Sequence, residues 1–331
     1  AEFELLQFDL HTTFLRSAPA SSDISIWQFL GPVLKGARTV VADFETVCDA
    51  ARLFGLIKRE GITLIELVPV LLQGLLEHAR GLEANDRSLP DLERAMVTGE
   101  AVTVPLVNQW LDTYPDIQLV NAYGPTEAAD DTSQFIVAAK LPADRRSVPI
   151  GKPIPNMNHY VLDAHLHLVP IGVPGEICVA GIGVGDGYWQ DEDKTRTHFT
   201  ANPYVDDDPP SKGDAVLYRT GDRGFWRADG NLEYLERLDT QVKVRGFRIE
   251  LGEIETLLAD HPAVRETAVC VRADEDGDRR LSAYFVADLS STQTRQELAG
   301  LRDEQVQLWK ELHENSYQST PTDFDPTFNT I

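Results

Sequence analysis

Residues 121–127 read Asn121-Ala122-Tyr123-Gly124-Pro125-Thr126-Glu127, and they directly follow the apolar run at residues 117–120. An aromatic ring such as that of Tyr123 can cover a flat base, and a Gly-Pro turn exposes backbone amides. The hydroxyl of Thr126 can reach a phosphate oxygen, and the carboxylate of Glu127 can hold Mg²⁺. Taken alone, the stretch also fits an ordinary turn after a strand, so its surroundings have to separate a nucleotide site from a plain turn.

The chain from about residue 40 to about residue 140 alternates between helical and strand periodicity. The pattern predicts helices over 47–57, 69–78 and 104–111, and strands over 62–68, 94–97 and 117–121. Strands that alternate with helices predict a parallel sheet covered by helices, and such sheets bind ligands beyond the carboxyl ends of their strands. We therefore expect Glu66, the turn at 98–100 and the loop at 121–127 on one rim of the sheet.

After about residue 145 the helical periodicity gives way to short alternating segments with Gly and Pro turns, which are typical of antiparallel strands. From residue 239 the pattern is that of a small α+β unit, with strands near 241–245, 247–250, 264–272 and 281–286. The fold class is therefore predicted as α/β. The expected divisions are an α/β subdomain at 1–145, a barrel-like antiparallel β subdomain at 146–238, a partial α+β subdomain at 239–290, and a polar segment at 291–331 with a helix over 301–312.

The composition of the 331 residues is that of a globular protein with a strong acidic excess, at a net charge of −23. This charge argues against nucleic acid or an anionic membrane as the main partner. The three cysteines, Cys48, Cys178 and Cys270, are odd in number and far apart, which favours a reducing compartment over a disulfide framework. With no apolar run of about 18 residues and no signal-peptide pattern, we predict a cytoplasmic location.

Three sequence runs are informative together because of their order and spacing: NAYGPTE at 121–127, YRTGD at 218–222 and ERLDTQVKVRGFRIELGEIE at 236–255. Over about residues 1–290 the chain resembles the adenylation domains of nonribosomal peptide synthetases, within the acyl-adenylate-forming ligases. The turn Thr98-Gly99-Glu100 and the Gly-rich segment GEICVAGIGVGDGYW at 175–189 support this resemblance. Glu236 departs from it, because the family usually has Gly before the following Arg.

The resemblance implies a ligase that joins an amino acid to AMP from ATP and then loads it onto the phosphopantetheine thiol of a carrier protein. By similarity Tyr123 stacks on adenine, Thr126 contacts phosphate, Glu127 binds Mg²⁺ and Asp222 binds the ribose hydroxyls. Asp222 could alternatively cap its own turn. The full nucleotide set that the resemblance implies is Gly99, Glu100, Asn121, Ala122, Tyr123, Gly124, Thr126, Asp222 and Arg237.

The resemblance also implies a substrate pocket, in which Asp23 holds the α-ammonium group of the amino acid. The other pocket positions are Ile24, Trp27, Glu66, Met96, Thr98, Ala122, Asp130 and Asp131. Several carboxylates in one pocket repel one another unless a cation compensates. We therefore predict a substrate with a basic side chain, such as ornithine, lysine or arginine. The alternative is that Asp130 and Asp131 point into solvent.

The resemblance implies that Asp239 is the hinge at which the small domain turns between the two half-reactions. It also implies that Gly246 lets the thioester-forming loop approach the pantetheine arm of the carrier protein. Lys243 is a candidate catalytic residue beside that loop. Lys243 and Arg245 could equally belong to an exposed charged strand. Two further features carry less weight: the glycines at 181, 183, 185 and 187 lack the sequence of a phosphate loop, and His165 and His167 lack a third metal ligand nearby.

The family's phosphate loop would lie upstream of residue 1 and its catalytic lysine beyond residue 290, so we expect a fragment. Residues 307–331 resemble the start of a methyltransferase domain that interrupts some adenylation domains. The implied partners are the carrier protein, neighbouring condensation and methyltransferase domains, and a small MbtH-like activator protein. The alternatives are another acyl-adenylate or acyl-CoA ligase, in which Asp23 would have no α-amine to bind, and a non-catalytic docking role.

Overall fold

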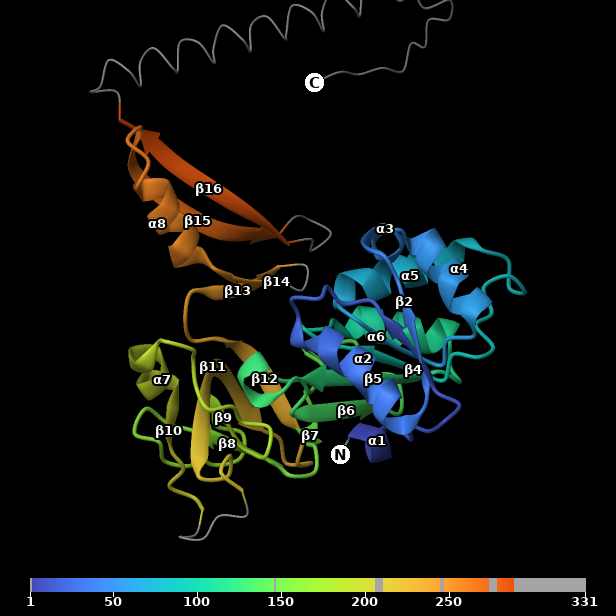
Figure 1. Ribbon diagram of the computed structural model, residues 1–331, viewed down its shortest axis with the longest axis horizontal. Coiled ribbons are helices and arrows are strands. Elements are labelled where there is room, and N and C mark those ends of the chain that lie inside the picture. Colours follow the sequence, from blue (N-terminus) through green and yellow to red (C-terminus); the bar gives the residue numbers. More distant parts are fainter. Residues whose placement is uncertain (1, 146, 206–210, 245–246, 274–278, 289–331) are drawn as a thin grey trace, which may run out of the picture. The chain divides into compact units, whose positions relative to one another are not determined.

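The structure is a computed structural model, and it describes residues 2–145, 147–205, 211–244, 247–273 and 279–288 (Figure 1). Within the chain there are two compact units, residues 1–249 and residues 250–331. The domain boundary that the sequence predicts at residue 239 lies upstream of this division. The candidate site residues all belong to the first unit.

A seven-stranded sheet forms the first part of the larger unit, in the order β2-β1-β3-β4-β5-β6-β7. The strands from β2 to β5 are parallel, and β6 and β7 are antiparallel to their neighbours. This confirms the predicted parallel sheet and adds an antiparallel edge. The strands are β1 (Thr13–Arg16), β2 (Arg38–Val41), β3 (Leu64–Leu67), β4 (Arg94–Val97), β5 (Gln118–Tyr123), β6 (Ser133–Val137) and β7 (Lys152–Pro153).

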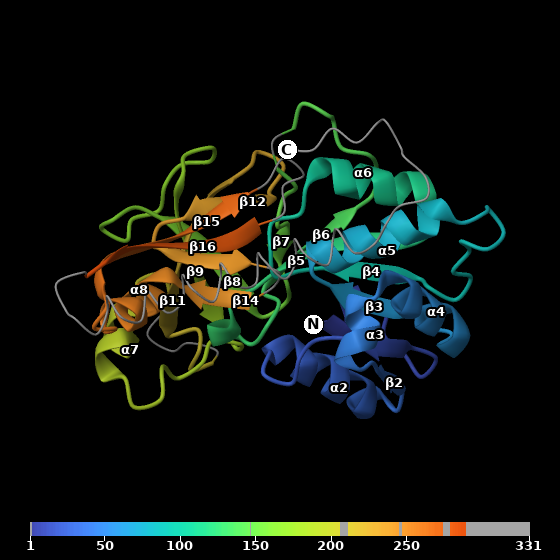
Figure 2. The same cartoon turned by 90° about the horizontal axis from the view of Figure 1, so that it is seen from above.

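Helices connect these strands, and Figure 2 shows α6 and α2 to either side of β3, β4 and β5. The helix predicted over 47–57 is in fact two helices, because Asp49 accepts from the backbone amides of Ala51 and Arg52 and so caps the second one. Gly61 ends that second helix at a φ of 59°. The helices are α1 (Glu2–Leu5), α2 (Asp23–Lys35), α3 (Phe44–Cys48), α4 (Ala50–Glu60), α5 (Pro69–Gly81) and α6 (Val104–Thr113).

The two faces of the parallel sheet carry separate hydrophobic clusters, because successive strand residues point to opposite sides. Ile65 and Ala95 belong to a large cluster with residues of α4, α5 and α6. Leu64 and Met96 belong to a smaller cluster on the other face, against which Trp27 of α2 packs. The face covered by α2 is thus the one that also receives Glu66.

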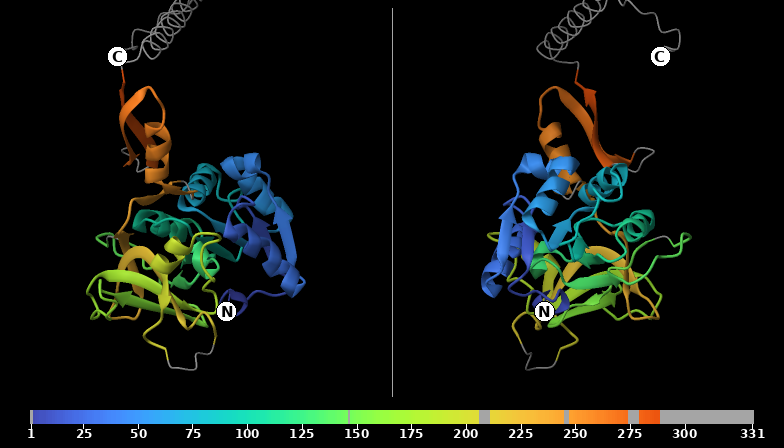
Figure 3. Two further views of the ribbon diagram at one scale, coloured as in Figure 1. Left: turned by 60° about the vertical axis from the view of Figure 1, so that its left-hand side comes forward. Right: turned by 90° about the vertical axis from the view of Figure 1, so that its right-hand side faces the viewer.

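A second, antiparallel sheet follows, drawn in colours from yellow-green to orange in Figure 3. The barrel-like closure expected from the sequence is not present among the pairings of the described strands, because long β11 pairs with β9 along one side and with β10 and then β12 along the other. A bridge between Gly151 and Leu232 joins the two sheets. The elements are β8 (Met157–Leu162), β9 (Gly175–Gly181), α7 (Glu192–His198), β10 (Phe199–Ala201), β11 (Val216–Trp226) and β12 (Leu232–Arg237).

The strands predicted between residues 239 and 290 are confirmed within the described residues, and the α+β unit also contains a helix. β13 (Gln241–Val244) and β14 (Phe247–Glu250) form a two-stranded pair, and in the second unit α8 (Leu251–Ala259) contacts β15 (Val264–Ala273), which pairs with β16 (Arg279–Ala287). The helix predicted at 301–312 lies outside the described residues. Within the described part of the chain, no helix has both the length and the apolar character needed to cross a membrane.

Candidate active site

The strand register of the parallel sheet brings several predicted pocket residues to one face. Glu66 on β3 pairs with Met96 on β4, and Met96 pairs with Val120 on β5. Met96, Ala122 and the ring of Trp27 all belong to the cluster on this face. Glu66, Met96 and Ala122, which are far apart in sequence, therefore lie on the face that α2 covers, and α2 contributes Trp27 to the same face.

Three carboxylates converge at the carboxyl ends of these strands. One oxygen from each of Glu66, Asp130 and Asp131 lies within 4.8 Å of the others. Asp131 is 6% exposed and accepts a hydrogen bond of 3.3 Å from the hydroxyl of Thr98, so its side chain does not point into solvent. Gly124 lets the backbone of Asp130 lie against the end of β5, because a Cβ on Gly124 would lie 1.6 Å from the carbonyl oxygen of Asp130. Such a cluster suits a cationic ligand.

Asp23 and Ile24, both half-buried, lie in the first turn of α2. One oxygen of Asp23 accepts from the backbone amide of Ile24 at 3.0 Å. One turn later, the fully buried amide of Gln28 accepts from the backbone amides of Ser17 and Ala18, and it donates to the carbonyl of Glu66 at 3.3 Å. Gln28 thus joins the loop before α2 to the pocket strand, a role that no sequence motif indicated.

The predicted adenine residue, Tyr123, is the last residue of β5. Its hydroxyl donates to Asp222 at 2.6 Å, and its ring meets His159 edge-on at 6.3 Å between centroids. The preceding Asn121 is buried and donates to the carbonyl of Pro149 at 2.7 Å, which anchors the strand end. Burial, reinforced by Asp222, raises the pKa of Tyr123 well above its ordinary value, so the hydroxyl stays protonated.

Asp222 lies on β11 opposite Arg237 on β12, and the two side chains form an ion pair of 3.1 Å. Arg237 also donates to both oxygens of Asp239, at 2.7 and 2.6 Å. Burial raises the pKa of Asp222 despite the opposing effect of Arg237. The ribose and hinge residues that the resemblance implies are therefore linked through one guanidinium. Glycine is required at position 221, since its φ is 73° and a Cβ there would lie 2.9 Å from side-chain atoms of Arg237 and Asp239.

Glu127 lies in the short 3-10 helix η1 (Thr126–Ala128), where Thr126 is exposed and Ala128 is buried. Its side chain is 9% exposed and accepts from the hydroxyl of Tyr188 at 2.7 Å. Arg248 donates from its Nη1 atom to both carboxylate oxygens, each at 2.9 Å. Sequence reasoning missed both partners.

These contacts determine the charge of the site. Burial by itself raises the pKa of Glu127, but Arg248 and Tyr188 outweigh it and hold the pKa at about 2. Burial raises the pKa of Tyr188 to about 12, so that residue remains a donor. The guanidinium nitrogen of Arg248 lies between both oxygens of Glu127, so this carboxylate can accept a cation at that position. Carboxylate oxygens are also the ligands that Mg²⁺ prefers. The donor set is therefore compatible with the implied metal.

Three predicted residues complete the rim. Gly99 and Glu100 form the half-buried turn after β4, in which Gly99 has a φ of 84°. Lys243 on β13 is also half-buried, and burial lowers its pKa while Asp222 and Asp23 raise it. Lys243 is thus within electrostatic reach of both Asp222 and Asp23, and it is not a residue of a fully exposed strand. Arg245 and Gly246 lie outside the described residues.

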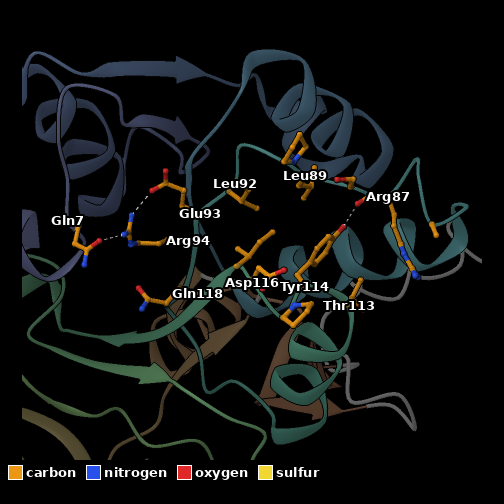
Figure 4. Close-up of a pocket in the computed structure, with 15 residues that line it drawn as sticks. Gln7, Arg87, Leu89, Leu92, Glu93, Arg94, Thr113, Tyr114, Asp116 and Gln118 are labelled. Atoms are coloured by element: carbon orange, nitrogen blue, oxygen red, sulfur yellow. Dashed lines mark hydrogen bonds and ion pairs between the residues drawn. The ribbon is translucent and has the colours of Figure 1, made fainter.

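A separate cavity of about 710 Å³ opens at the other end of the parallel strands (Figure 4). Arg94 and Gln118, the first residues of β4 and β5, line it, and none of the predicted site residues does. Arg94 is held there by Glu93 at 3.0 Å and by Gln7 at 2.8 Å. Because ligands of parallel sheets bind at the carboxyl ends, this cavity is distinct from the candidate active site.

Residues 2–189 match the family of AMP-binding enzymes. Tyrocidine synthase 3 of Brevibacillus parabrevis is 39% identical over 83% of this chain, which is 4% of that protein. The dimodular nonribosomal peptide synthase of Bacillus subtilis (strain 168) is 42% identical over 80% of this chain and 10% of its own length. The chain thus spans a tenth or less of these curated relatives.

Solved structures give the same assignment. An NRPS protein containing adenylation and PCP domains, bound to a vinylsulfonamide inhibitor, superposes with a TM-score of 0.75 at 29% identity, over 86% of this chain and 48% of that one. A four-domain nonribosomal peptide synthetase bound to AMP and glycine superposes with a TM-score of 0.60 at 32% identity, over 88% of this chain and 21% of that one.

Proposed function

Because the chain belongs to the family of AMP-binding enzymes, with nonribosomal peptide synthetases among its relatives, we propose that it activates an amino acid as an aminoacyl adenylate. The observation that carries this proposal is the contact between Tyr123 and Asp222, at 2.6 Å across 99 residues of sequence. It places an aromatic ring beside a buried carboxylate. These are the two groups that a nucleoside requires, one for the base and one for the ribose hydroxyls.

In the proposed first half-reaction the carboxylate of the amino acid attacks the α-phosphorus of ATP, and the bond to pyrophosphate breaks. Displacement at phosphorus depends mainly on positioning and charge neutralisation. Glu127 would hold Mg²⁺, which supplies that neutralisation when bound. The chain's own residues would orient the nucleotide: Gly99, Glu100, Asn121, Ala122, Tyr123, Gly124, Thr126, Asp222 and Arg237.

For the substrate we propose an amino acid with a basic side chain. Asp23 would bind the α-ammonium group, and the cluster of Glu66, Asp130 and Asp131 would bind the second cation. Charge-assisted hydrogen bonds of this kind are about twice as strong as neutral ones. Ile24, Trp27, Met96, Thr98 and Ala122 would shape the rest of the pocket.

In the proposed second half-reaction the phosphopantetheine thiol of a carrier protein attacks the adenylate, which yields a thioester and AMP. Asp239 would act as the hinge for this step, and Lys243 would lie beside the reacting groups. A solved relative that contains adenylation and PCP domains supports a carrier partner. We further propose condensation and methyltransferase domains as neighbours of this chain and a small MbtH-like protein as its activator.

The test is ATP–pyrophosphate exchange with the full-length protein, supplied with each proteinogenic amino acid and with ornithine. We expect exchange to be fastest with ornithine, lysine or arginine. Fastest exchange with an aliphatic or acidic amino acid would rule out the basic substrate, and no exchange with any of them would rule out adenylation of these amino acids. Calorimetric titration of this chain with ATP tests the docking alternative, which requires that the chain itself binds no nucleotide.

A further inference from the structure

The Gly-rich segment at 181–187 lies directly against the turn that carries Glu127. The amide of Gly185 donates to the carbonyl of Glu127 at 2.9 Å. A Cβ on Gly183 would lie 2.6 Å from the carbonyl oxygen of Ala128, so only glycine permits this approach. These glycines, which lack the sequence of a phosphate loop, therefore have a different role. They let the segment that follows β9 pack directly against η1.

Tyr188 follows this segment, and its ring is held in place on several sides. It meets Phe199 edge-on at 5.5 Å and His198 at 6.0 Å between centroids, and its hydroxyl lies 3.4 Å from that of the buried Tyr218. Its backbone amide donates to the hydroxyl of Thr195 at 2.9 Å. The orientation of the tyrosine is thus independent of the hydrogen bond of 2.7 Å that it donates to Glu127.

A cation bound to Glu127 would displace Arg248 but could coexist with Tyr188. Arg248 contacts both oxygens, so a metal ion bound by this carboxylate would take the place of its guanidinium. Tyr188 is neutral and uses one lone pair of Oε1, which leaves other lone pairs for a metal. A hydrogen bond from a neutral group to a ligating carboxylate fixes its direction without competing for it.

We propose that Tyr188, delivered by the glycine segment, is a positioning residue that orients the carboxylate of Glu127 for Mg²⁺. This proposal deepens the proposed function and rests on it. In this proposal the second sheet contributes Tyr188, and Tyr188 sets the orientation of the Glu127 carboxylate, which follows the first sheet.

The experiment replaces Tyr188 by phenylalanine in the full-length protein, which removes only the hydroxyl. Loss of an outer-shell partner typically costs ten- to a hundredfold in metal affinity, so we expect the half-saturating Mg²⁺ concentration in exchange to rise about tenfold. The dissociation constant of Mn²⁺ in the presence of ATP, followed by the EPR signal of free Mn²⁺, should rise similarly. The KM for the amino acid and the melting temperature should stay unchanged.

Tyr114→Phe is the matched control, since the Tyr114 hydroxyl also donates one hydrogen bond, to Arg87 at 2.9 Å, but it lines the cavity at the opposite end of the strands (Figure 4). It should leave the metal dependence unchanged. If Tyr188→Phe fails to fold, Thr195→Val carries the same test, because it removes the hydroxyl that accepts from the backbone amide of Tyr188 and leaves η1 unchanged.

The two readouts separate the two proposals. Equal Mn²⁺ dissociation constants for the unaltered protein and for Tyr188→Phe would overturn the role of Tyr188, and so would an equal rise in the Tyr114→Phe control. Absence of amino-acid-dependent exchange in the unaltered protein would instead count against the proposed function, while the Mn²⁺ measurement would still decide whether Tyr188 positions Glu127.

Discussion

Glu127 and Asp222 are surrounded by the same kinds of groups, yet their acidities shift in opposite directions. Each accepts from one tyrosine hydroxyl and one arginine, at 2.7 and 2.9 Å for Glu127 and at 2.6 and 3.1 Å for Asp222. The pKa of Glu127 is lowered to about 2, whereas the pKa of Asp222 is raised. Similar hydrogen-bond partners therefore do not by themselves determine the charge of a carboxylate.

The difference lies in how the arginine is shared, because the two side chains are nearly equally buried, at 9% exposed for Glu127 and 11% for Asp222. Arg248 donates to both oxygens of Glu127, so its charge offsets the cost of burying the carboxylate. Arg237 donates to one oxygen of Asp222 and uses its other nitrogens for Asp239. Desolvation of the buried Asp222 then outweighs the ion pair, and the pKa of Asp222 rises. A guanidinium that contacts both oxygens therefore keeps a buried carboxylate ionised more effectively than one that is shared with a second carboxylate.

The largest expected effect comes from removing the shared arginine. Arg237→Ala leaves Asp222 buried beside Asp239 without its guanidinium, and removing one partner of a buried pair costs about 3 kcal/mol. We expect that loss in the free energy of unfolding, measured by urea denaturation. Arg223→Ala is the matched control on β11, because its pair with Glu236 is exposed and should contribute less than about 0.5 kcal/mol. Equal losses in the two variants would contradict the shared-arginine explanation.

A smaller effect is expected at the third group of carboxylates, where Glu66 accepts from the neutral Gln28. Glu66→Gln removes one negative charge from the pocket without changing its shape. Because a hydrogen bond to a charged group contributes about 1.5 kcal/mol or more, the ratio of kcat/KM for basic over neutral amino acids should fall about tenfold.

The control for this pocket variant is Asp116→Asn, an exposed carboxylate at the opposite cavity, which should leave the ratio unchanged. A ratio that is unaffected by Glu66→Gln would remove Glu66 from the specificity pocket.

The smallest effect is the pH dependence of stability that Glu127 contributes. Its folded pKa of about 2 lies below the ordinary 4.5, so its contribution is fully present above pH 4.5 and is lost as the pH falls toward 2. Since Arg248 is partly exposed, we expect only about 1 kcal/mol from this effect. Asp222 has the opposite effect on the pH dependence of stability. Its raised pKa means that the folded state binds a proton more tightly than the unfolded state, so its contribution to stability grows as the pH falls.

Urea unfolding of the unaltered protein and of Glu127→Gln, compared between pH 5 and pH 3, isolates this contribution. The difference between the two should shrink as the pH falls. Glu192→Gln, at an exposed position of α7, should run parallel to the unaltered protein. A constant difference between the unaltered protein and Glu127→Gln would mean that Arg248 does not control the charge of Glu127.

Much of the site was predictable from local patterns. The alternation of strands and helices placed Glu66 and the Tyr123 loop on one rim, and the strand register confirms that shared face for Glu66. Tyr188, Arg248 and Gln28 could not be found in this way. The first two contact Glu127 across 61 and 121 residues of sequence, and neither stands in a motif that names its partner. The local signal for Tyr188 was the glycine segment just before it, which supported the resemblance but did not indicate a contact with Glu127.

Hydrophobic periodicity, turn residues and short motifs were enough to identify the order of the elements and the chemical kinds of groups at the stretch 121–127, because these depend on near neighbours in the chain. The charge of those groups depended on tertiary structure. Whether Glu127 and Asp222 attract or release a proton follows from burial and from arginines that arrive on other strands. Electrostatic energies depend on distances in space and on the surrounding dielectric, and neither is written in the local sequence.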